Sequence, residues 1–350
     1  MHIPFCEKRC RYCHFVSSLE MGLQGEYLDA LEEDMRGEHR LEESHITTIY
    51  VGGGTPSLLE PEYRRRLLSL LRPYHREGAE WTVEVNPESV TRELLEDYVA
   101  AGVNRISMGV QSMNDEQLQV LGRIHDQRRV KDAVKMIREA GIQNLNLDLI
   151  YNYDDQHLLE KSLRGILALE PEHISIYELE LEENLSDLRV LDSDESYEQF
   201  HLLDRELTKS GYIRYEVSNY AKPGYESRHN SRYWSGDEYF GFGLSASSLL
   251  EGTRMKRTSH MATYLASTST LEESEALTED DLAFEVWLLG LRTSKGVHEA
   301  SFLRDFSNHA WMMDVIHAHL ERGNLHREEG YIRATEQGFD LLHQILVDLI

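Results

Sequence analysis

Cysteine is almost absent from this sequence, and none follows residue 13. A disulfide framework is therefore excluded, and free thiols without an export signal indicate a reducing cytoplasm. No apolar stretch approaches the roughly 20 residues that a membrane-spanning helix requires. The cysteine-rich segment begins within a few residues of Met1, which leaves no room for a signal peptide before it. We therefore expect a cytoplasmic protein without a membrane span.

Basic residues are also scarce, because 36 lysines and arginines face 62 aspartates and glutamates, a formal charge of -26. Such a surface repels phosphate backbones and anionic membranes, which argues against nucleic acid as a partner. The acidic residues are concentrated at residues 178–198 and 272–285. Neither run has the spacing of a cation-binding loop, so we interpret both as solvated faces.

The three cysteines that are present, Cys6, Cys10 and Cys13, follow one another at spacings of four and three residues. Three thiolates so close together suit one soft-metal centre. Around a four-iron cube they would leave one iron open, where a ligand can bind and receive an electron. The alternative is a zinc ion completed by His14, although adjacent Cys13 and His14 are poorly spaced for one tetrahedral ion.

Short β-rich runs alternate with amphipathic segments from residue 46 onward, which indicates repeated β/α units around a parallel sheet. Helical spacing over residues 27–35, 92–101 and 130–137 predicts helices, the last two ending at Gly102 and Gly141. The expected strands are residues 47–51, 81–85, 105–110, 145–150, 173–179 and 213–217.

Polar residues cluster where these strands end, which is where parallel β/α folds build their active sites. Any single one of them could instead begin a turn; five strand ends together favour a site. The residues concerned are Gly52 to Gly54, Glu84 and Asn86, Gln111, Asp148, and Glu178.

The alternation stops after about residue 249, and the remainder predicts helices at 282–291 and 311–320, a hairpin at 325–334 and a final helix at 335–350. This order suggests a small winged-helix-like module. The segment is not markedly basic, so we expect a packing or lid role rather than DNA binding.

Several blocks of sequence form a pattern that is specific when the blocks are taken together. They are His2-Ile3-Pro4-Phe5-Cys6 with the Cys-x3-Cys-x2-Cys spacing, Tyr50 to Pro56, Glu84 to Glu88, Arg105 to Ser112, Leu121 to His125, and Asn146 to Tyr151. In these blocks the chain resembles the radical S-adenosylmethionine (SAM) superfamily and, within it, the oxygen-independent coproporphyrinogen III oxidase family. The resemblance implies an α/β fold, a partial (β/α)6 barrel with a C-terminal winged-helix-like α+β module. The expected divisions are a barrel over 1–220, a connecting and porphyrin-pocket segment over 221–275, and the C-terminal module over 276–350.

The same resemblance implies a 4Fe-4S cluster on Cys6, Cys10 and Cys13, with SAM chelating the fourth iron. Reduction of the cluster would then cleave SAM to a 5'-deoxyadenosyl radical. Glycines after a strand allow backbone groups to approach a ligand closely, although tight strand exits also use glycine for conformation alone. Carboxylates would bind the ammonium and ribose hydroxyls of SAM, Gln111 would act as a neutral donor, and Arg123 would bind the SAM carboxylate. The alternative is that these residues form structural salt bridges with one another. The implied SAM-site residues are Tyr12, Gly53, Gly54, Thr55, Glu84, Gln111, Arg123 and Asp148.

A further block, Ser227 to Trp234, resembles the His-Asn-x2-Tyr-Trp motif of the HemW heme-chaperone branch. By this resemblance His229 is the expected heme ligand, with Asn230, Tyr233 and Trp234 in the same site. Imidazole is a suitable axial donor, and the two aromatic rings offer flat apolar surface to a porphyrin. The alternative is that the aromatic residues belong to the core and His229 is an ordinary hydrogen-bonding histidine.

The sequence departs from the family pattern in several places. The oxidases carry a fourth cysteine two residues after the third, where Phe15 stands here, and this favours the HemW branch. The family tyrosine four residues before Pro4 and the aspartate at the position of His14 are missing. The loop at residues 151–156 is bulkier and more acidic than usual, and Ser247 replaces a histidine in the segment after Gly241 and Gly243.

Three functions follow as hypotheses. The first is a heme chaperone that binds heme, a 4Fe-4S cluster and SAM and passes heme to an acceptor protein, with a reducing electron donor such as a flavodoxin. The second is a radical enzyme that decarboxylates coproporphyrinogen III or modifies a related tetrapyrrole of porphyrin biosynthesis. The third is a cluster-bearing structural or regulatory protein without turnover. The radical machinery is expected in the first two, while Phe15 argues against the oxidase reaction.

Overall fold

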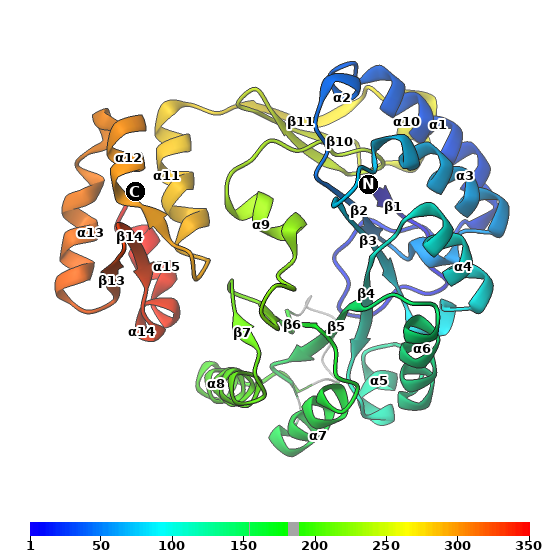
Figure 1. The fold of residues 1–350 in the computed structure, drawn as a ribbon, viewed down its shortest axis with the longest axis horizontal. Helices are drawn as coiled ribbons and strands as arrows, with labels where there is room; N and C mark the ends of the chain where they lie inside the picture. Colours follow the sequence, from blue (N-terminus) through cyan, green and yellow to red (C-terminus); the bar gives the residue numbers. More distant parts are fainter. Residues whose placement is uncertain (154, 181–188) are drawn as a thin grey trace.

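The computed structural model describes residues 1–153, 155–180 and 189–350. Its main feature is an eight-stranded sheet in the order β1-β2-β3-β4-β5-β6-β8-β7, in which the first six strands run parallel. The sheet curves into an open barrel with helices on its outer face (Figure 1). The strands are β1 (His2–Ile3), β2 (Thr48–Gly53), β3 (Glu80–Val85), β4 (Arg105–Gln111), β5 (Asn144–Tyr151), β6 (His173–Glu178), β7 (Ile213–Arg214) and β8 (Asn219–Ala221). The predicted partial (β/α)6 barrel is confirmed.

Two sequence expectations differ in detail from the sheet. The sixth parallel strand is β6, and the run expected as a strand at 213–217 supplies only β7, which pairs antiparallel with β8. The first strand is present although short, because His2 and Ile3 pair with Gly52 and Gly53 of β2. Residue 154 of the loop at 151–156 and residues 181–188 of the first acidic run lie outside the described residues.

The helices begin and end where local chemistry predicts. The Thr91 side chain accepts a hydrogen bond from the Leu94 N–H at the start of α4, and Gly102 ends that helix with φ of 107°. A left-handed φ costs glycine little because it has no Cβ. The helices over the barrel are α1 (Gln24–Gly37), α2 (Arg40–Glu43), α3 (Pro61–Leu71), α4 (Arg92–Ala101), α5 (Asp115–Val120), α6 (Gln127–Glu139), α7 (Gln156–Leu167) and α8 (Ser193–Lys209).

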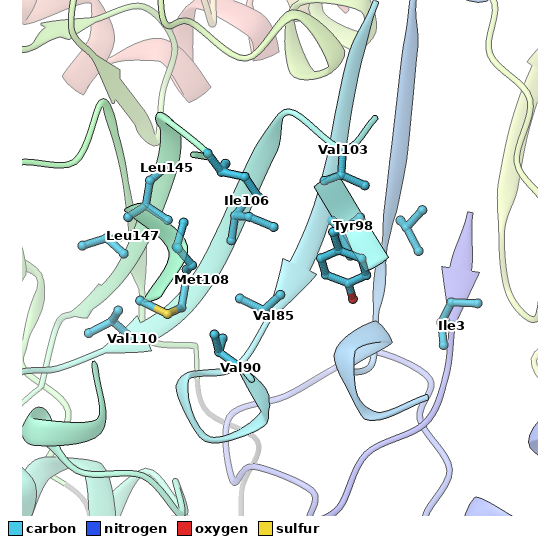
Figure 2. Packing of buried hydrophobic residues seen from close by; sticks show 14 of the residues in the cluster. Ile3, Val85, Val90, Tyr98, Val103, Ile106, Met108, Val110, Leu145 and Leu147 are labelled. Atoms are coloured by element: carbon cyan, nitrogen blue, oxygen red, sulfur yellow. The ribbon is translucent and has the colours of Figure 1, made fainter. Parts of the chain in front are cut away.

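The two faces of the barrel strands differ in chemistry. Side chains such as Ile106, Met108 and Val110 of β4 pack into the main hydrophobic core (Figure 2). The alternate positions of the same strands are polar, as Glu80, Thr82 and Glu84 of β3 illustrate. The barrel interior is therefore a polar surface enclosed by an apolar shell, suited to polar ligands.

A buried hydrogen-bond network lines this interior. Asn146 donates to Ser107 Oγ at 2.8 Å and to Asp148 Oδ1 at 2.7 Å, and its Oδ1 lies 2.7 Å from His173 Nδ1. His173 Nε2 in turn lies 2.8 Å from the Tyr215 hydroxyl. Because buried polar groups cost free energy unless they are paired, this network fixes the side chains on three neighbouring strands.

A second sheet closes one side of the barrel. It consists of β9 (Ser247–Leu250), β10 (Thr253–Arg257) and β11 (Leu271–Ala276), with α10 (Met261–Ala266) between the last two strands. All residues of β11 are exposed, so this part of the second acidic run is a solvated face as expected. The helix α9 (Arg228–Trp234) lies in the opening of the curved main sheet (Figure 1).

One buried carboxylate ties the second sheet to α1. Asp34 forms an ion pair with Arg257 at 2.7 Å and accepts hydrogen bonds from the Gly243 N–H and the Tyr264 hydroxyl, both at 3.0 Å. The Asp34 side chain is only 2% exposed, and burial raises the pKa of its carboxyl. Asp34 therefore anchors the segment around Gly243, whose neighbours Phe242 and Ser245 line the cavity described below.

Replacing Asp34 with alanine should lower the free energy of unfolding by about 3 kcal/mol, because it leaves the largely buried Arg257 without its counter-charge. Chemical denaturation measures the loss. The matched control is Lys135→Ala, which breaks an exposed pair with Glu139 on α6 and should change stability by less than about 0.5 kcal/mol. Equal effects of the two substitutions would contradict the anchoring role of Asp34.

The C-terminal part has its own hydrophobic core, separate from the barrel core. In chain order it contains α11 (Glu279–Gly290), β12 (Val297–His298), α12 (Glu299–Asp305), α13 (Met312–Glu321), β13 (Leu325–Glu328), β14 (Tyr331–Ala334), α14 (Glu336–Asp340) and α15 (Leu342–Val347). The three strands form one small sheet in the order β12-β14-β13, which confirms the winged-helix-like module and the predicted hairpin. The expected final helix is interrupted at Leu341, between α14 and α15.

The module packs against the end of the barrel. The Arg214 guanidinium lies between the rings of Phe200 and Phe339, at 4.7 and 4.5 Å from their centroids. The Tyr197 hydroxyl donates to Asp340 at 3.1 Å, and α11 also contacts α9. These contacts support the packing role. The boundaries near 220 and 275 stay a prediction.

Candidate functional site

The three cysteines lie on the loop that follows β1, at the C-terminal end of the parallel strands. All three are free and partly exposed. The loop is held by backbone hydrogen bonds from Cys6 N to Ser18 O and from Cys13 N to Cys10 O, at 3.0 and 3.3 Å. The Cys6 sulfur lies 3.8 Å from Thr55 Oγ1, which ties the cysteine loop to the end of β2.

The donor set of this loop fits an iron–sulfur cube. In the described part of the chain, no three His, Cys, Asp or Glu side chains are arranged to hold a single metal ion. An iron–sulfur cube does not require its cysteines to converge on one ion, because each cysteine binds a different iron. Burial raises the pKa of the Cys6 and Cys13 thiols, so cluster assembly must displace their protons as the metal binds.

Arg123 joins the cysteine loop to two strand ends. Its guanidinium donates to Cys10 Sγ and to the Tyr12 hydroxyl, both at 3.5 Å. It also donates to Asn86 Oδ1 at 2.7 Å and to the Gly109 carbonyl at 2.9 Å. A buried cation beside a cluster cysteine is where a carboxylate chelating the cluster would find a partner. The structure thus brings the expected Tyr12 and Arg123 together with Cys10.

The glycine-rich turn surrounds Glu84. A Cβ at Gly52 would collide with the Glu84 carboxyl, and one at Gly54 would lie 2.7 Å from the Pro4 carbonyl carbon. Gly53 has φ of 108° and donates its N–H to Glu84 Oε2 at 2.9 Å. The N–H groups of Gly52 and Gly54 bond to backbone carbonyls near β1. Any backbone contact of this turn with SAM would therefore use carbonyl oxygens.

Gln111 and Asp148 complete this end of the barrel. Gln111 has φ of 69° at the end of β4, where the register with β5 shifts. Within the described residues, its side-chain oxygen is buried without a hydrogen-bond partner. Burial, with a smaller contribution from the charge of Glu84, raises the pKa of Asp148 to about 7. An orphaned acceptor and two desolvated carboxylates fit a ligand that carries an ammonium and hydroxyl groups.

If ionised Asp148 holds SAM, the affinity for SAM should rise roughly five- to tenfold between pH 6 and pH 7.5, because the carboxylate accepts hydroxyl donors better than the acid. Calorimetric titration measures this dependence. Asp148→Asn should flatten it, whereas Asp132→Asn on the exposed face of α6 should not. An unchanged pH slope in Asp148→Asn would exclude the role.

The free energy of unfolding depends on pH in the opposite direction. Because the pKa of Asp148 is raised in the folded protein, the contribution of this residue to stability falls as pH rises from about 4 to about 7.

A cavity of about 790 Å³ opens beside the cysteine loop. Its lining includes the expected heme ligand His229 together with Tyr233, and also Gly52, Gly53 and Glu84 of the expected SAM site. Asn230 and Trp234 are not among its lining residues. Other residues that face the cavity include His14, Phe15, Tyr50, Tyr239, Phe240, Phe242 and Ser247.

His229 is held firmly in the cavity wall. Its backbone N–H donates to Glu80 at 3.0 Å, which fixes α9 to the start of β3. Its Nδ1 lies 2.8 Å from Thr48 Oγ1 and its Nε2 lies 3.1 Å from the Tyr233 hydroxyl. Burial lowers the pKa of His229 to about 3, so the imidazole is neutral and one nitrogen keeps a lone pair. Iron could bind at Nε2 once the Tyr233 hydroxyl moves aside.

Two residues of this region, Tyr50 and Glu80, were not singled out from the sequence, whereas Asn86 was expected only as a polar residue at a strand end. Asn86 donates to Thr55 Oγ1 at 2.9 Å and accepts from Arg123, and Tyr50 donates to Glu84 at 2.7 Å. Glu80 anchors α9. The alternation of polar residues along β2 and β3 is the signal that could have found Tyr50 and Glu80. Conversely, Glu178 accepts from Asn152 and Ser196, and so stabilises the start of α8.

Comparison with known proteins agrees with this geometry. Residues 1–161 match the family model described as the radical SAM superfamily. The heme chaperone HemW of Bacillus subtilis is 33% identical, over 97% of this chain and 95% of its own length. HemW of Escherichia coli is 35% identical, over 99% of this chain and 96% of its own. The chain belongs to the HemW family.

Among solved structures, the radical SAM enzyme coproporphyrinogen III oxidase (HemN) from Escherichia coli superposes with a TM-score of 0.87. The alignment covers 99% of this chain and 88% of that one at 23% identity, so it establishes the shared fold. The HemW branch is supported instead by the HemW relatives, which match nearly the whole chain. None of the helices in the described part of the chain is long and apolar enough to cross a membrane.

Three positions at which this HemW-family chain departs from the expected pattern, His14, Phe15 and Ser247, border the cavity, whereas none of the described residues of the loop at 151–156 is among its lining residues. Phe15, which stands where the oxidases have a fourth cysteine, is 66% exposed and lines the cavity beside His14. Ser247, at the position of the missing histidine, begins β9 and also faces the cavity. The loop before it is tied down by a hydrogen bond from the Leu244 N–H to the Tyr27 hydroxyl at 3.0 Å.

Proposed function

We propose that this protein is a cytoplasmic heme chaperone that binds heme against His229 and passes it to an acceptor protein. The cysteines Cys6, Cys10 and Cys13 would hold a 4Fe-4S cluster, which leaves a position for SAM. The observation that carries the proposal is the cavity lined by His229 and Tyr233 beside the cysteine loop. Membership of the HemW family supports it, because the curated relatives bear the name heme chaperone.

The chemistry of the cavity suits a porphyrin with acidic side chains. Aromatic rings from Tyr233, Tyr239 and Phe240 provide apolar surface for a flat ring. Arg232 and Lys256 also line the cavity and bring two cations to it, although both have carboxylate partners in the protein. Propionates could exchange with those partners at little cost, since exposed ion pairs contribute little.

The cluster and SAM have groups ready to receive them. Gln111 offers an oxygen that has no partner among the described residues, and Glu84 and Asp148 offer carboxylates to the ammonium and ribose hydroxyls of SAM. When bound and reduced, the cluster supplies an electron that cleaves SAM. Arg123 would orient the SAM carboxylate next to Cys10. A low-potential donor such as a flavodoxin would deliver the electron.

A heme titration of the protein with its cluster reconstituted under anaerobic conditions tests the proposal. We expect saturable binding of one heme per chain, followed by transfer to an added apo-hemoprotein. A second arm supplies coproporphyrinogen III with SAM and a reductant and analyses the tetrapyrrole. Absence of saturable heme binding, or decarboxylation of coproporphyrinogen III, would contradict the chaperone function.

A further inference from the structure

One side chain stands between the two groups of residues that line the cavity. The Tyr50 hydroxyl donates to Glu84 Oε1 at 2.7 Å. The Tyr50 ring stacks on the His229 imidazole, with the centroids 5.0 Å apart and the planes 21° from parallel. Tyr50 therefore contacts one residue of the expected SAM site and one of the expected heme site.

The orientation of the His229 ring depends on β2. Thr48 Oγ1 lies 2.8 Å from His229 Nδ1, while Tyr50 covers one face of the imidazole. These two residues are separated by one position along the strand, so their side chains point to the same face. A change in the position of the Tyr50 ring would therefore change the orientation of the His229 imidazole.

The position of the Tyr50 ring depends in turn on Glu84. The two oxygens of Glu84 accept hydrogen bonds from the Tyr50 hydroxyl and the Gly53 N–H. Burial raises the pKa of the Glu84 carboxyl, although the hydrogen bonds from Tyr50 and Gly53 and the charges of the Met1 ammonium and Arg105 act in the opposite direction. A ligand that brings an ammonium or hydroxyl donors to Glu84 would stabilise the anionic carboxylate. A charged acceptor then holds the tyrosine hydroxyl more strongly than a neutral one.

We propose that Tyr50 couples the two sites, so that SAM bound at Glu84 tightens heme binding at His229. The inference rests on the proposed function, which assigns SAM and heme to these residues. A ring fixed by Glu84 holds the imidazole in one orientation before the heme arrives. Less conformational freedom is then lost when the iron binds. Because coupling between two ligands is reciprocal, heme should tighten SAM binding by the same factor.

The test uses the full chain with a reconstituted, oxidised cluster and without reductant, so that SAM stays intact. Ferric heme is titrated by absorbance with and without saturating SAM. We expect SAM to lower the heme dissociation constant about fivefold or more, the lower end of typical coupling between sites. Tyr50→Phe keeps the ring and removes the hydroxyl that reaches Glu84, so the SAM effect on the heme dissociation constant should fall to within twofold.

Two controls separate the possible failures. Tyr212→Phe removes another buried tyrosine hydroxyl, which donates to the Pro171 carbonyl at 2.6 Å. Tyr212 does not line the cavity, so this variant should retain the full SAM effect. SAM titrations of the same proteins without heme establish that SAM still binds. An SAM effect that persists in Tyr50→Phe, or none in the unsubstituted protein, overturns the coupling while leaving heme binding intact. Failure of the unsubstituted protein to bind heme at all would instead refute the proposed function.

Discussion

Replacing any one of Cys6, Cys10 and Cys13 with alanine should abolish the iron–sulfur cluster and, with it, the binding of SAM. The three thiols are the only cysteines of the chain, so no other thiol can substitute for a lost one. Each thiolate would hold a different iron of the cube. Iron and sulfide should fall from about four per chain to below about one after anaerobic reconstitution. Calorimetric titration should then detect no SAM binding.

His14→Ala decides between the cube and the zinc alternative. If the three cysteines hold a cube, this variant should reconstitute with the iron content of the unsubstituted protein. If His14 completes a tetrahedral zinc site, the variant should lose metal as the cysteine variants do. Metal analysis by mass spectrometry reads both elements in one preparation. Retention of a full cluster by any of the three alanine variants would refute the assignment of that cysteine.

Heme affinity should fall at least tenfold in His229→Ala, which corresponds to about 1.4 kcal/mol of binding free energy. The reason is the loss of a neutral imidazole whose orientation is already fixed by Thr48 and Tyr50. The absorbance spectrum of the complex should change as well, since the axial ligand sets the electronic state of the iron. Surface histidines also bind heme weakly, so the matched control is His157→Ala on the exposed side of α7. It should bind like the unsubstituted protein.

Tyr233→Phe sharpens the same experiment. In the structure the Tyr233 hydroxyl lies 3.1 Å from His229 Nε2, so iron must displace it. A typical hydrogen bond contributes about 0.5–1.5 kcal/mol net, so its removal should tighten heme binding roughly two- to tenfold. The phenyl ring would keep the apolar surface. Unchanged affinity and spectrum in His229→Ala would remove His229 as the ligand, whatever Tyr233→Phe does.

Much of the barrel was predictable because its signals are local. Strand and helix periods, Gly102 at the end of α4 and Gly141 after α6 all depend on residues near one another in the chain. The error at residues 213–217 has the same origin. That run has the composition of a strand, but the chain reverses after Arg214 and forms a hairpin with β8. The residues of this run do not by themselves determine with which strand it pairs.

The polar face of the barrel was harder to interpret from sequence. Glu178 and Glu84 both stand near strand ends, yet Glu84 faces the cavity while Glu178 accepts hydrogen bonds from Asn152 and Ser196. Which way a side chain points follows from strand pairing and curvature, and these depend on contacts between distant segments. The same holds for Asn86, which lies between Arg123 and Thr55.

The sequence by itself determined which cofactors to expect. Three thiols within eight residues and the family pattern around them can be recognised without any knowledge of tertiary contacts. Only the tertiary structure decided where heme and SAM would meet. His229 and Thr48 are 181 positions apart in the chain, and they touch because Glu80 anchors α9 inside the opening of the barrel. The physical reason is that a ligand cavity is bounded by surfaces from many segments, whereas a cysteine motif lies within one.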